Sequence, residues 1–180
     1  MTLAELNALD ADAAARELRR CCGSTRWAAA MAARRPFPSL DAVMDAGDRL
    51  WASLDRSDWL EAFAAHPRIG ERDADKEWAG RAGRAGGAGS ESTERWSAQE
   101  QAGVTDDSRA RFEELNREYE SRFGYIFIVC ATGKSAGEML RILERRIGNN
   151  PDDELREAAE AQRQITRLRL AKLIAAEADR

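Results

Sequence analysis

Only one stretch of this chain, residues 125–131, has the composition of a β-strand. It reads YIFIVCA, a run rich in aromatic and β-branched residues, which favour extended backbone. A single strand has no neighbour to pair with its backbone groups and is not stable alone. Because the rest of the sequence follows helical spacing, we expect an all-α protein in which this run is a buried extended segment.

Four helices are predicted before residue 70. Each helix is expected to start at a capping residue that precedes apolar positions spaced three and four residues apart. The ends are predicted from a glycine, which can act as a C-cap, or from prolines, which cannot continue a helix. The expected starts are Thr2 with Glu5 in a capping box, a point just before Trp27, Ser39, and Ser57 or Asp58. The expected ends are Gly23 as a C-cap for the first helix, residues 35–38 for the second, and residues 65–66 before Pro67 for the fourth. The third helix carries apolar positions as far as Leu54.

Helical spacing resumes from Ser97. One helix carries Phe112, Leu115, Tyr119 and Phe123 on a single face and ends at Gly124. Ser135 and Glu138 form a second capping box, opening a helix with Met139, Leu143 and Ile147 that ends at Gly148. Asn150 and Pro151 begin the last helix, with proline in its favoured first turn. We therefore expect an irregular bundle of about seven to nine helices, in a single domain over residues 1–180.

Residues 71–95 differ from the rest. Positions 80–89 are rich in glycine and poor in apolar residues, a composition typical of flexible connections. The glycines do not make a dinucleotide-binding fingerprint, because Ser92 stands where the third glycine is required. We expect a mobile loop here.

The overall composition narrows the class of protein. The chain has 180 residues and a net charge of −4, and its basic residues alternate with acidic ones, which argues against a nucleic-acid partner. No apolar run approaches the roughly 20 residues of a membrane span. Three cysteines, two of them adjacent, do not suggest a disulfide framework and fit the reducing cytosol. We expect a cytoplasmic protein with structural cysteines.

His66 is the only histidine, and it is the first candidate for acid–base chemistry, because an unperturbed imidazole titrates near neutral pH. A structural role for a single histidine stays open. Glu100 and Gln101 are the next candidates, although Ser97 and Glu100 also have capping-box spacing, and the two interpretations are compatible. With one histidine and no clustered cysteines, we expect no metal site. The sequence around Lys134 resembles the end of a phosphate-binding loop, but Ile128 stands where that loop needs glycine.

Taken in order along the chain, five blocks closely resemble the OHCU decarboxylase family. Those enzymes act on 2-oxo-4-hydroxy-4-carboxy-5-ureidoimidazoline, and the resemblance extends over nearly the whole chain. The blocks are His66-Pro67-Arg68-Ile69-Gly70, Ser97-x-x-Glu100-Gln101-Ala102-Gly103, Leu115-Asn116-x-x-Tyr119, Phe123-Gly124-Tyr125-Ile126-Phe127 and Arg146-Ile147-x-Asn149.

The resemblance implies an all-α homodimer that needs no cofactor and releases (S)-allantoin and carbon dioxide. It implies that His66 is the proton donor, and we expect Glu100 to hold the imidazole or the substrate hydroxyl by hydrogen bonding. It also implies a set of residues in contact with the substrate: Pro67, Ser97, Ala98, Gln99, Glu100, Gln101, Phe127, Ile128, Val129, Cys130 and Ala131. Two alternatives stay open, namely a non-catalytic helical binding module on the same scaffold and a lyase acting on a related ureido compound.

Overall fold

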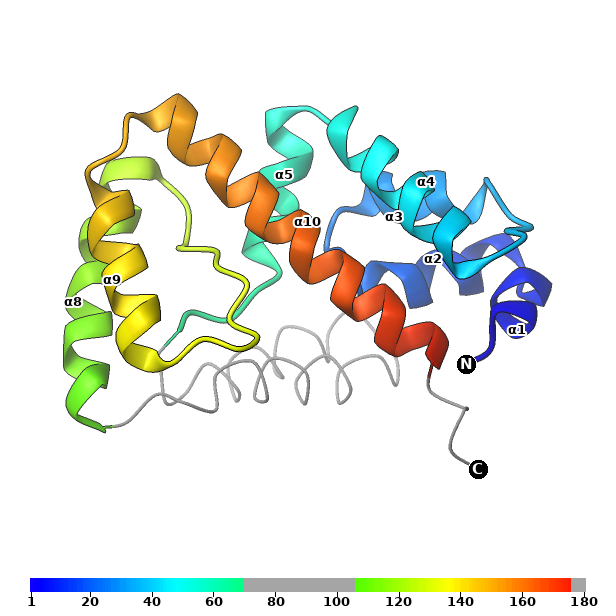
Figure 1. The fold of residues 1–180 in the computed structure, drawn as a ribbon. Helices are drawn as coiled ribbons and strands as arrows, with labels where there is room; N and C mark the ends of the chain where they lie inside the picture. Colours follow the sequence, from blue (N-terminus) through cyan, green and yellow to red (C-terminus); the bar gives the residue numbers. More distant parts are fainter. Residues whose placement is uncertain (70–105, 176–180) are drawn as a thin grey trace. The chain divides into compact units, whose positions relative to one another are not determined.

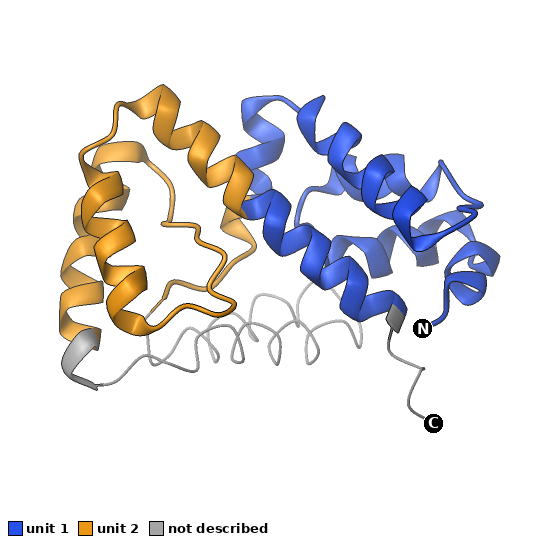
Figure 2. Ribbon diagram, viewed as in Figure 1, with its two compact units in different colours: residues 1–62, 162–180 blue, residues 63–161 orange. Residues whose placement is uncertain are grey.

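The computed structural model describes residues 1–69 and 106–175. Eight α-helices and no β-strand lie in this part of the chain, so the predicted all-α class is confirmed (Figure 1). The chain groups into two compact units, with residues 1–62 and 162–180 in unit 1 and residues 63–161 in unit 2 (Figure 2). The single-domain organisation over residues 1–180 stays a prediction.

Unit 1 is built of short helices packed in sequence, with α2 against α3 and α3 against α4. At its centre the buried indole of Trp27 donates from Nε1 to the carbonyl oxygen of Gly47 at 3.0 Å. The elements of the unit are α1 (Leu3–Ala8), α2 (Ala11–Arg19), α3 (Thr25–Ala32), α4 (Leu40–Ala52), most of α5 (Arg56–Ala64) and the second part of α10 (Pro151–Ala175).

The first predicted helix is two helices, so that prediction was wrong. Leu9 has extended backbone after α1 ends, and Asp10 then caps α2 by accepting from the N–H of Ala13 at 2.7 Å. The guanidinium of Arg35 donates to the carbonyl oxygens of Leu6, at 2.8 Å, and of Leu9. A helix leaves the carbonyl groups at its C-terminus unpaired, and Arg35 supplies donors to these carbonyl groups at the break between α1 and α2.

Most other helix boundaries follow the predicted signals. Both capping boxes form, Ser39 caps α4, and Gly148 is the C-cap of the helix that Ser135 opens. Two signals were misassigned. Gly23 is not a C-cap, since α2 already ends with Arg20 in that position. The start of α5 is one or two residues earlier than predicted, because Asp55 Oδ1 accepts from the N–H groups of Ser57 and Asp58.

Unit 2 contains two neighbouring helices, α8 (Asp106–Phe123) and α9 (Ala136–Ile147), which run in the same direction (Figure 1). The chain between them must therefore return along their length. The 12 residues of α9 rise about 18 Å, a distance that about six extended residues can cover. Residues 126–131 make this return, in neither helix nor strand.

The return begins at a glycine and runs through the core. Gly124 ends α8 with φ +80°, a conformation that glycine adopts without strain. Phe127, Ile128, Cys130 and Ala131 are all buried. The predictions of a helix end at Gly124 and of a buried non-helical segment are both confirmed. We call residues 126–131 the return segment.

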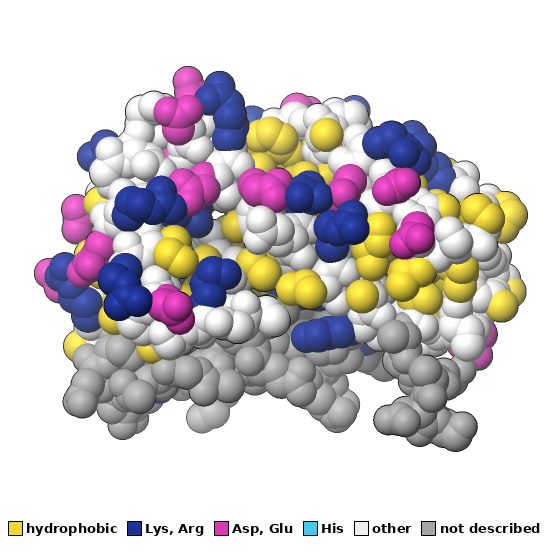
Figure 3. Space-filling model, viewed as in Figure 1, with side chains coloured by type: hydrophobic (Ala, Val, Ile, Leu, Met, Phe, Trp, Pro, Cys, Tyr) yellow, Lys and Arg dark blue, Asp and Glu magenta, His cyan; other side chains and the backbone are white. Residues whose placement is uncertain are grey.

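Charged side chains of both signs are interleaved on the face shown in Figure 3. In unit 1, for example, Asp48 Oδ2 accepts from Arg163 at 2.8 Å and from Arg167 at 2.7 Å. These pairs agree with the alternation of basic and acidic residues that the sequence shows. Among the described helices, none is long and apolar enough to cross a membrane.

Candidate active site

His66 lies in the loop that follows α5. The helix ends at Ala64, and the N–H of His66 donates to the carbonyl oxygen of Phe63 at 3.0 Å, which closes a last turn. Pro67 comes next, and the residue before a proline avoids helical backbone. The imidazole is half-buried. The loop thus holds the only histidine of the sequence at the edge of the unit 2 core, in partial contact with solvent.

Two side chains of α8 hold this loop in place. Buried Asn116 donates from Nδ2 to the carbonyl oxygen of Ile69 at 2.8 Å. Arg68 donates from Nε and Nη2 to the two carboxylate oxygens of Glu120 at 2.6 and 2.9 Å. Because the Arg68 pair faces solvent, its contribution to stability is small, and the buried amide of Asn116 is the stronger anchor of the two.

An aromatic cluster joins the His66 loop to the return segment. The rings of Phe63 and Tyr125 lie with centroids 5.4 Å apart, and Phe63 is three residues before His66. Tyr119 packs edge-on against Tyr125 at 5.9 Å and against Phe127 at 5.4 Å. Two of the three predicted parts of the site, the His66 loop and residues 127–131, are therefore connected within unit 2.

Some carbonyl groups of the return segment have hydrogen-bond partners among the described residues, whereas its N–H groups have none there. The carbonyl oxygen of Ile128 accepts from Arg146 Nη1 at 2.7 Å, and that of Cys130 accepts from Lys134 Nζ at 2.8 Å. Within the part of the chain that the structure describes, nothing accepts from the N–H groups of residues 126–131. Buried backbone N–H groups are normally paired, so those N–H groups that point to one side of the segment can donate to the oxygen atoms of a small polar ligand.

Behind the return segment lies a buried ion pair. The side chains of Arg146 and Glu154 are 1% and 0% exposed, and Nη2 is 2.6 Å from Oε1. Glu154 also accepts from Asn149 Nδ2 at 2.8 Å and from the Tyr119 hydroxyl. The Arg146 guanidinium carbon lies 4.8 Å from the centroid of the Phe127 ring, a distance typical of a cation–π contact. Burial raises the pKa of the Tyr119 hydroxyl well above its usual range, so it remains a proton donor.

The role of Arg146 was missed at the level of sequence. Its position was noted only as part of a resemblance, and Ile147 was assigned to the apolar face of the helix. The structure leaves Ile147 half-buried and buries Arg146 beside Met139 and Leu143, at helical spacing. An arginine on the apolar face of an amphipathic helix was the available signal.

The third predicted part of the site lies outside the described residues. It comprises Ser97, Ala98, Gln99, Glu100 and Gln101, and the Ser97–Glu100 capping box and the loop at 71–95 lie outside as well. In residues 1–69 and 106–175, no group of three His, Cys, Asp or Glu side chains is arranged to hold a metal ion.

The cysteines lie in the core, as predicted. Cys21, Cys22 and Cys130 are free thiols and all are buried. Burial raises the pKa of Cys21 and of Cys22 to about 12. Thiols held so firmly in the protonated form are poor nucleophiles, which agrees with a structural role for this pair.

Comparison with known proteins gives the family. The family model described as OHCU decarboxylase matches residues 7–171. The chain belongs to the OHCU decarboxylase family. A 2-oxo-4-hydroxy-4-carboxy-5-ureidoimidazoline decarboxylase from Haloferax volcanii is 29% identical to it over 98% of both chains. The uric acid degradation bifunctional protein TTL of Arabidopsis thaliana is 37% identical over 87% of this chain, which spans 46% of that longer protein.

Solved structures agree with this membership of the OHCU decarboxylase family. A crystal structure of OHCU decarboxylase in the presence of (S)-allantoin superposes with a TM-score of 0.70 and 32% identity, covering 89% of this chain and 98% of that one. A crystal structure of (S)-allantoin synthase has a TM-score of 0.66 at 19% identity, covering 97% of this chain and 54% of that one, and supports the fold alone.

Proposed function

We propose that this chain catalyses the decarboxylation of 2-oxo-4-hydroxy-4-carboxy-5-ureidoimidazoline to (S)-allantoin and carbon dioxide, as a carboxy-lyase of urate degradation. Its family membership supports the reaction. The structural observation that carries the proposal is the pairing, within unit 2, of the half-buried His66 with a buried segment of backbone whose N–H groups are available to a ligand.

The substrate itself can accept the electrons of the breaking bond. Its carboxylate sits on a carbon next to a ring C=N, so loss of carbon dioxide sends the electron pair of the C–C bond into that group. The protein then has three tasks. It must orient the ring, stabilise the charge that moves onto the ring nitrogen, and deliver a proton to one face of the adjacent, ureido-bearing carbon. The hydroxyl group on the carbon that lost the carboxylate gives up its proton at the same stage, so that this carbon becomes the ring carbonyl of allantoin. Such positioning and proton transfer are what a small set of fixed polar groups can supply.

We assign the proton to His66. Its position after α5 is fixed by the Phe63 carbonyl, by Pro67 and by the Asn116 bond to Ile69. A fixed imidazole reaches the substrate from one side only, so the proton arrives on one face and one enantiomer forms. Positioned acid–base groups of this kind contribute about 10²–10⁴-fold to rate.

The return segment is proposed to bind the heterocycle. Its N–H groups suit the carboxylate, ring carbonyl and ureido oxygens, which are all acceptors. Pro67, next to His66, and residues 127–131 belong to this part of the site. Glu100 and Gln101 are proposed to hold the substrate hydroxyl or the imidazole and the ureido group. A Glu100→Gln variant that lost melting temperature rather than rate would assign Glu100 to helix capping instead.

Two further proposals concern the protein in the cell. A homodimer is proposed from the family resemblance, and light scattering of the purified chain measures it. A cytoplasmic location is proposed because Cys21, Cys22 and Cys130 are free thiols, as expected in a reducing compartment. Fractionation of the source cells tests that location.

The deciding experiment generates the substrate in place by oxidation of urate and follows carbon dioxide release and the handedness of the allantoin. We expect faster release with the protein present and an excess of (S)-allantoin by circular dichroism. Unassisted decay, in which the proton reaches either face, gives both enantiomers. A non-catalytic binding module would leave rate and handedness unchanged, and a lyase for a related ureido compound would act on that compound instead. Either result would refute the proposal.

A further inference from the structure

We infer that Arg146 and Lys134 are positioning residues of the proposed decarboxylation. Each holds one carbonyl group of the return segment, and each thereby directs the N–H group of the next residue towards the substrate. This inference rests on the proposed function and deepens it. It also gives a role to the Lys134 motif, which did not fit a phosphate-binding loop.

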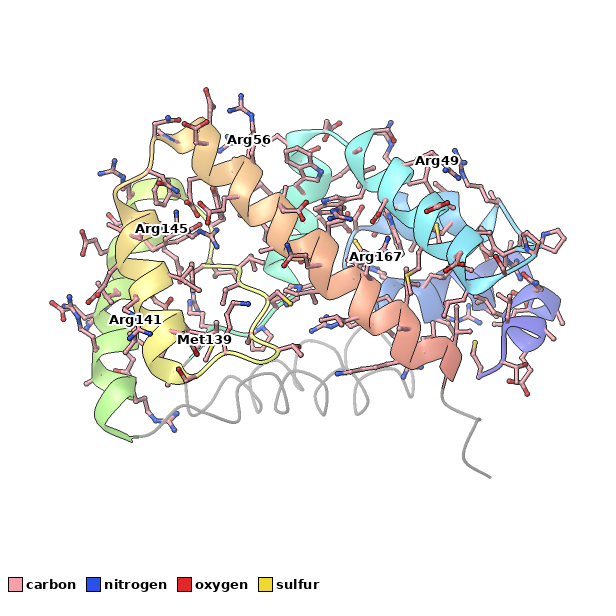
Figure 4. All side chains as sticks on the ribbon, in the orientation of Figure 1. Arg49, Arg56, Met139, Arg141, Arg145 and Arg167 are labelled. Carbon is pink, nitrogen blue, oxygen red and sulfur yellow. The ribbon has the colours of Figure 1, made fainter. Side chains whose placement is uncertain are left out.

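Arg146 holds the first carbonyl rigidly. Its Nη1 donates to the Ile128 oxygen at 2.7 Å, while Nε and Nη2 donate to Glu154 at 2.9 and 2.6 Å. The guanidinium is planar and its donors have a fixed geometry. The bonds to Glu154 therefore fix the direction in which Nη1 points towards the Ile128 oxygen. The neighbouring Arg145 lies on the exposed side of α9 (Figure 4) and pairs with Glu157, whose Oε1 is also 3.8 Å from Arg146 Nε.

Lys134 holds the second carbonyl from a tight turn. Its own N–H donates to the Ala131 oxygen at 3.0 Å, and Gly133 has φ +76° at the third position of that turn. A type II turn requires such a residue there. The turn brings the half-buried Lys134 side chain back over the segment, where Nζ donates to the Cys130 oxygen at 2.8 Å.

The peptide unit that joins each of these carbonyl groups to the next N–H group is trans. The only cis peptide bond among the described residues precedes Pro36, so the peptide units after Ile128 and Cys130 are trans. In a planar trans unit the C=O and the N–H point in opposite directions. The N–H of Val129 therefore points away from Arg146, and the N–H of Ala131 points away from Lys134.

The two cations act on alternate peptide units and leave the opposite N–H groups available. Within the described part of the chain, those N–H groups have no acceptor. A carbonyl that accepts from a cation polarises its own peptide unit, which strengthens the N–H on the other side as a donor. This arrangement suits an anionic, carbonyl-rich ring. Val129 and Ala131 are both among the residues predicted to contact the substrate.

The test compares Arg146→Lys and Lys134→Met with two matched controls, Arg156→Lys and Lys172→Met, which alter exposed cations of α10 outside the site. Steady-state kinetics with substrate made from urate is combined with calorimetric titration of (S)-allantoin, well below the melting temperature of each variant. We expect Arg146→Lys to lower kcat/KM by up to about 10²-fold, because the segment is displaced. We expect Lys134→Met to lower kcat/KM about tenfold, because a tenfold change corresponds to the free energy of about one hydrogen bond. Both should weaken allantoin binding, and the controls should not.

Each outcome is decisive. If the wild-type chain releases no carbon dioxide, the proposed function fails and the inference fails with it. If the wild type is active but both variants keep its KM and its allantoin affinity, the inference alone is overturned and the two cations only support the fold. If Arg146→Lys does not fold, the half-buried Lys134 decides the question, since losing one terminal ammonium leaves the core packed. Equal losses in the controls also overturn the inference.

Discussion

Tyr119 donates its hydroxyl hydrogen to Glu154, the same carboxylate that holds the buried guanidinium of Arg146. Its ring meanwhile packs against Tyr125 and Phe127, on either side of the start of the return segment. One side chain thus connects the buried charges to the wall of the site. Satisfied buried polar networks of this kind define one arrangement of a core, because every partial alternative leaves a polar group unpaired.

We predict that Glu154→Gln destabilises the chain more than Tyr119→Phe. Glu154→Gln leaves the Arg146 charge buried beside a neutral partner, which costs about 3–5 kcal/mol. Tyr119→Phe removes the hydrogen bond to Glu154 and a long one, 3.5 Å, from Arg146 Nη2. It costs about 1.5–3 kcal/mol, since Glu154 keeps its bonds from Arg146 and Asn149. Urea unfolding at neutral pH measures both values. The reverse order would show that Arg146 does not need the carboxylate.

We predict that His66→Ala lowers turnover by about 10²–10⁴-fold, the usual contribution of a positioned acid–base group. The far-ultraviolet circular dichroism should stay that of the wild type, because His66 lies in a loop after the end of α5 and its backbone bond to Phe63 does not depend on the side chain. Carbon dioxide release from freshly made substrate is the measurement. Wild-type turnover in this variant would remove His66 from the mechanism.

Local signals were enough to predict much of the fold. The Thr2–Glu5 and Ser135–Glu138 capping boxes and the glycine end at Gly124 were read correctly, because each depends on residues within one helical turn. The break at Asp10 is equally local but was missed. The alanine-rich, helix-favouring stretch around Asp10 predicts one continuous helix, although aspartate is also a strong N-cap.

Long-range pairing was not predictable from spacing. Arg146 and Ile128 are 18 positions apart, and the bond between them depends on how the return segment passes α9. The sequence predicted that residues 125–131 are buried and extended, but not which groups hold their carbonyls. The contact between Phe63 and Tyr125, which connects the two predicted parts of the site, depends on the tertiary fold in the same way.

We predict that the stability of the chain falls at alkaline pH because of Cys21 and Cys22. Their ordinary pKa is 9.0 and burial raises it to about 12 in the folded chain. Below pH 9 both states keep the protons and this stabilisation is complete. Above pH 9 the unfolded chain loses them first, so the free energy of unfolding falls by up to about 1.4 kcal/mol per pH unit for each thiol. The loss continues until the folded thiols titrate near pH 12.

Urea unfolding between pH 8 and pH 10.5 measures this slope. The matched variant is Cys21→Ala with Cys22→Ala, which starts from a lower stability but should show a shallower decline, since tyrosine and lysine titration is common to both proteins. Parallel slopes would mean that the two thiols are not protected in the folded chain. Reaction of the native wild type with a thiol reagent at pH 8 should likewise be slow and become fast in urea.

We predict that two glycine substitutions near Lys134 change the stability of the chain in opposite directions. Gly133 has φ +76°, and a Cβ atom built there meets nothing within 4 Å, so Gly133→Ala adds backbone strain without a steric clash. That strain costs about 1–2 kcal/mol, and the altered turn should also raise KM, because Lys134 moves away from the Cys130 oxygen. Gly137 lies inside α9 at an exposed position, where a Cβ atom meets only the end of Arg141 at 3.8 Å. Gly137→Ala should therefore stabilise the chain by up to about 1 kcal/mol, the helix-propensity difference at an interior position, and leave KM unchanged. Thermal unfolding and steady-state kinetics of both variants measure these effects, and stabilisation by Gly133→Ala would show that the turn does not need a positive φ.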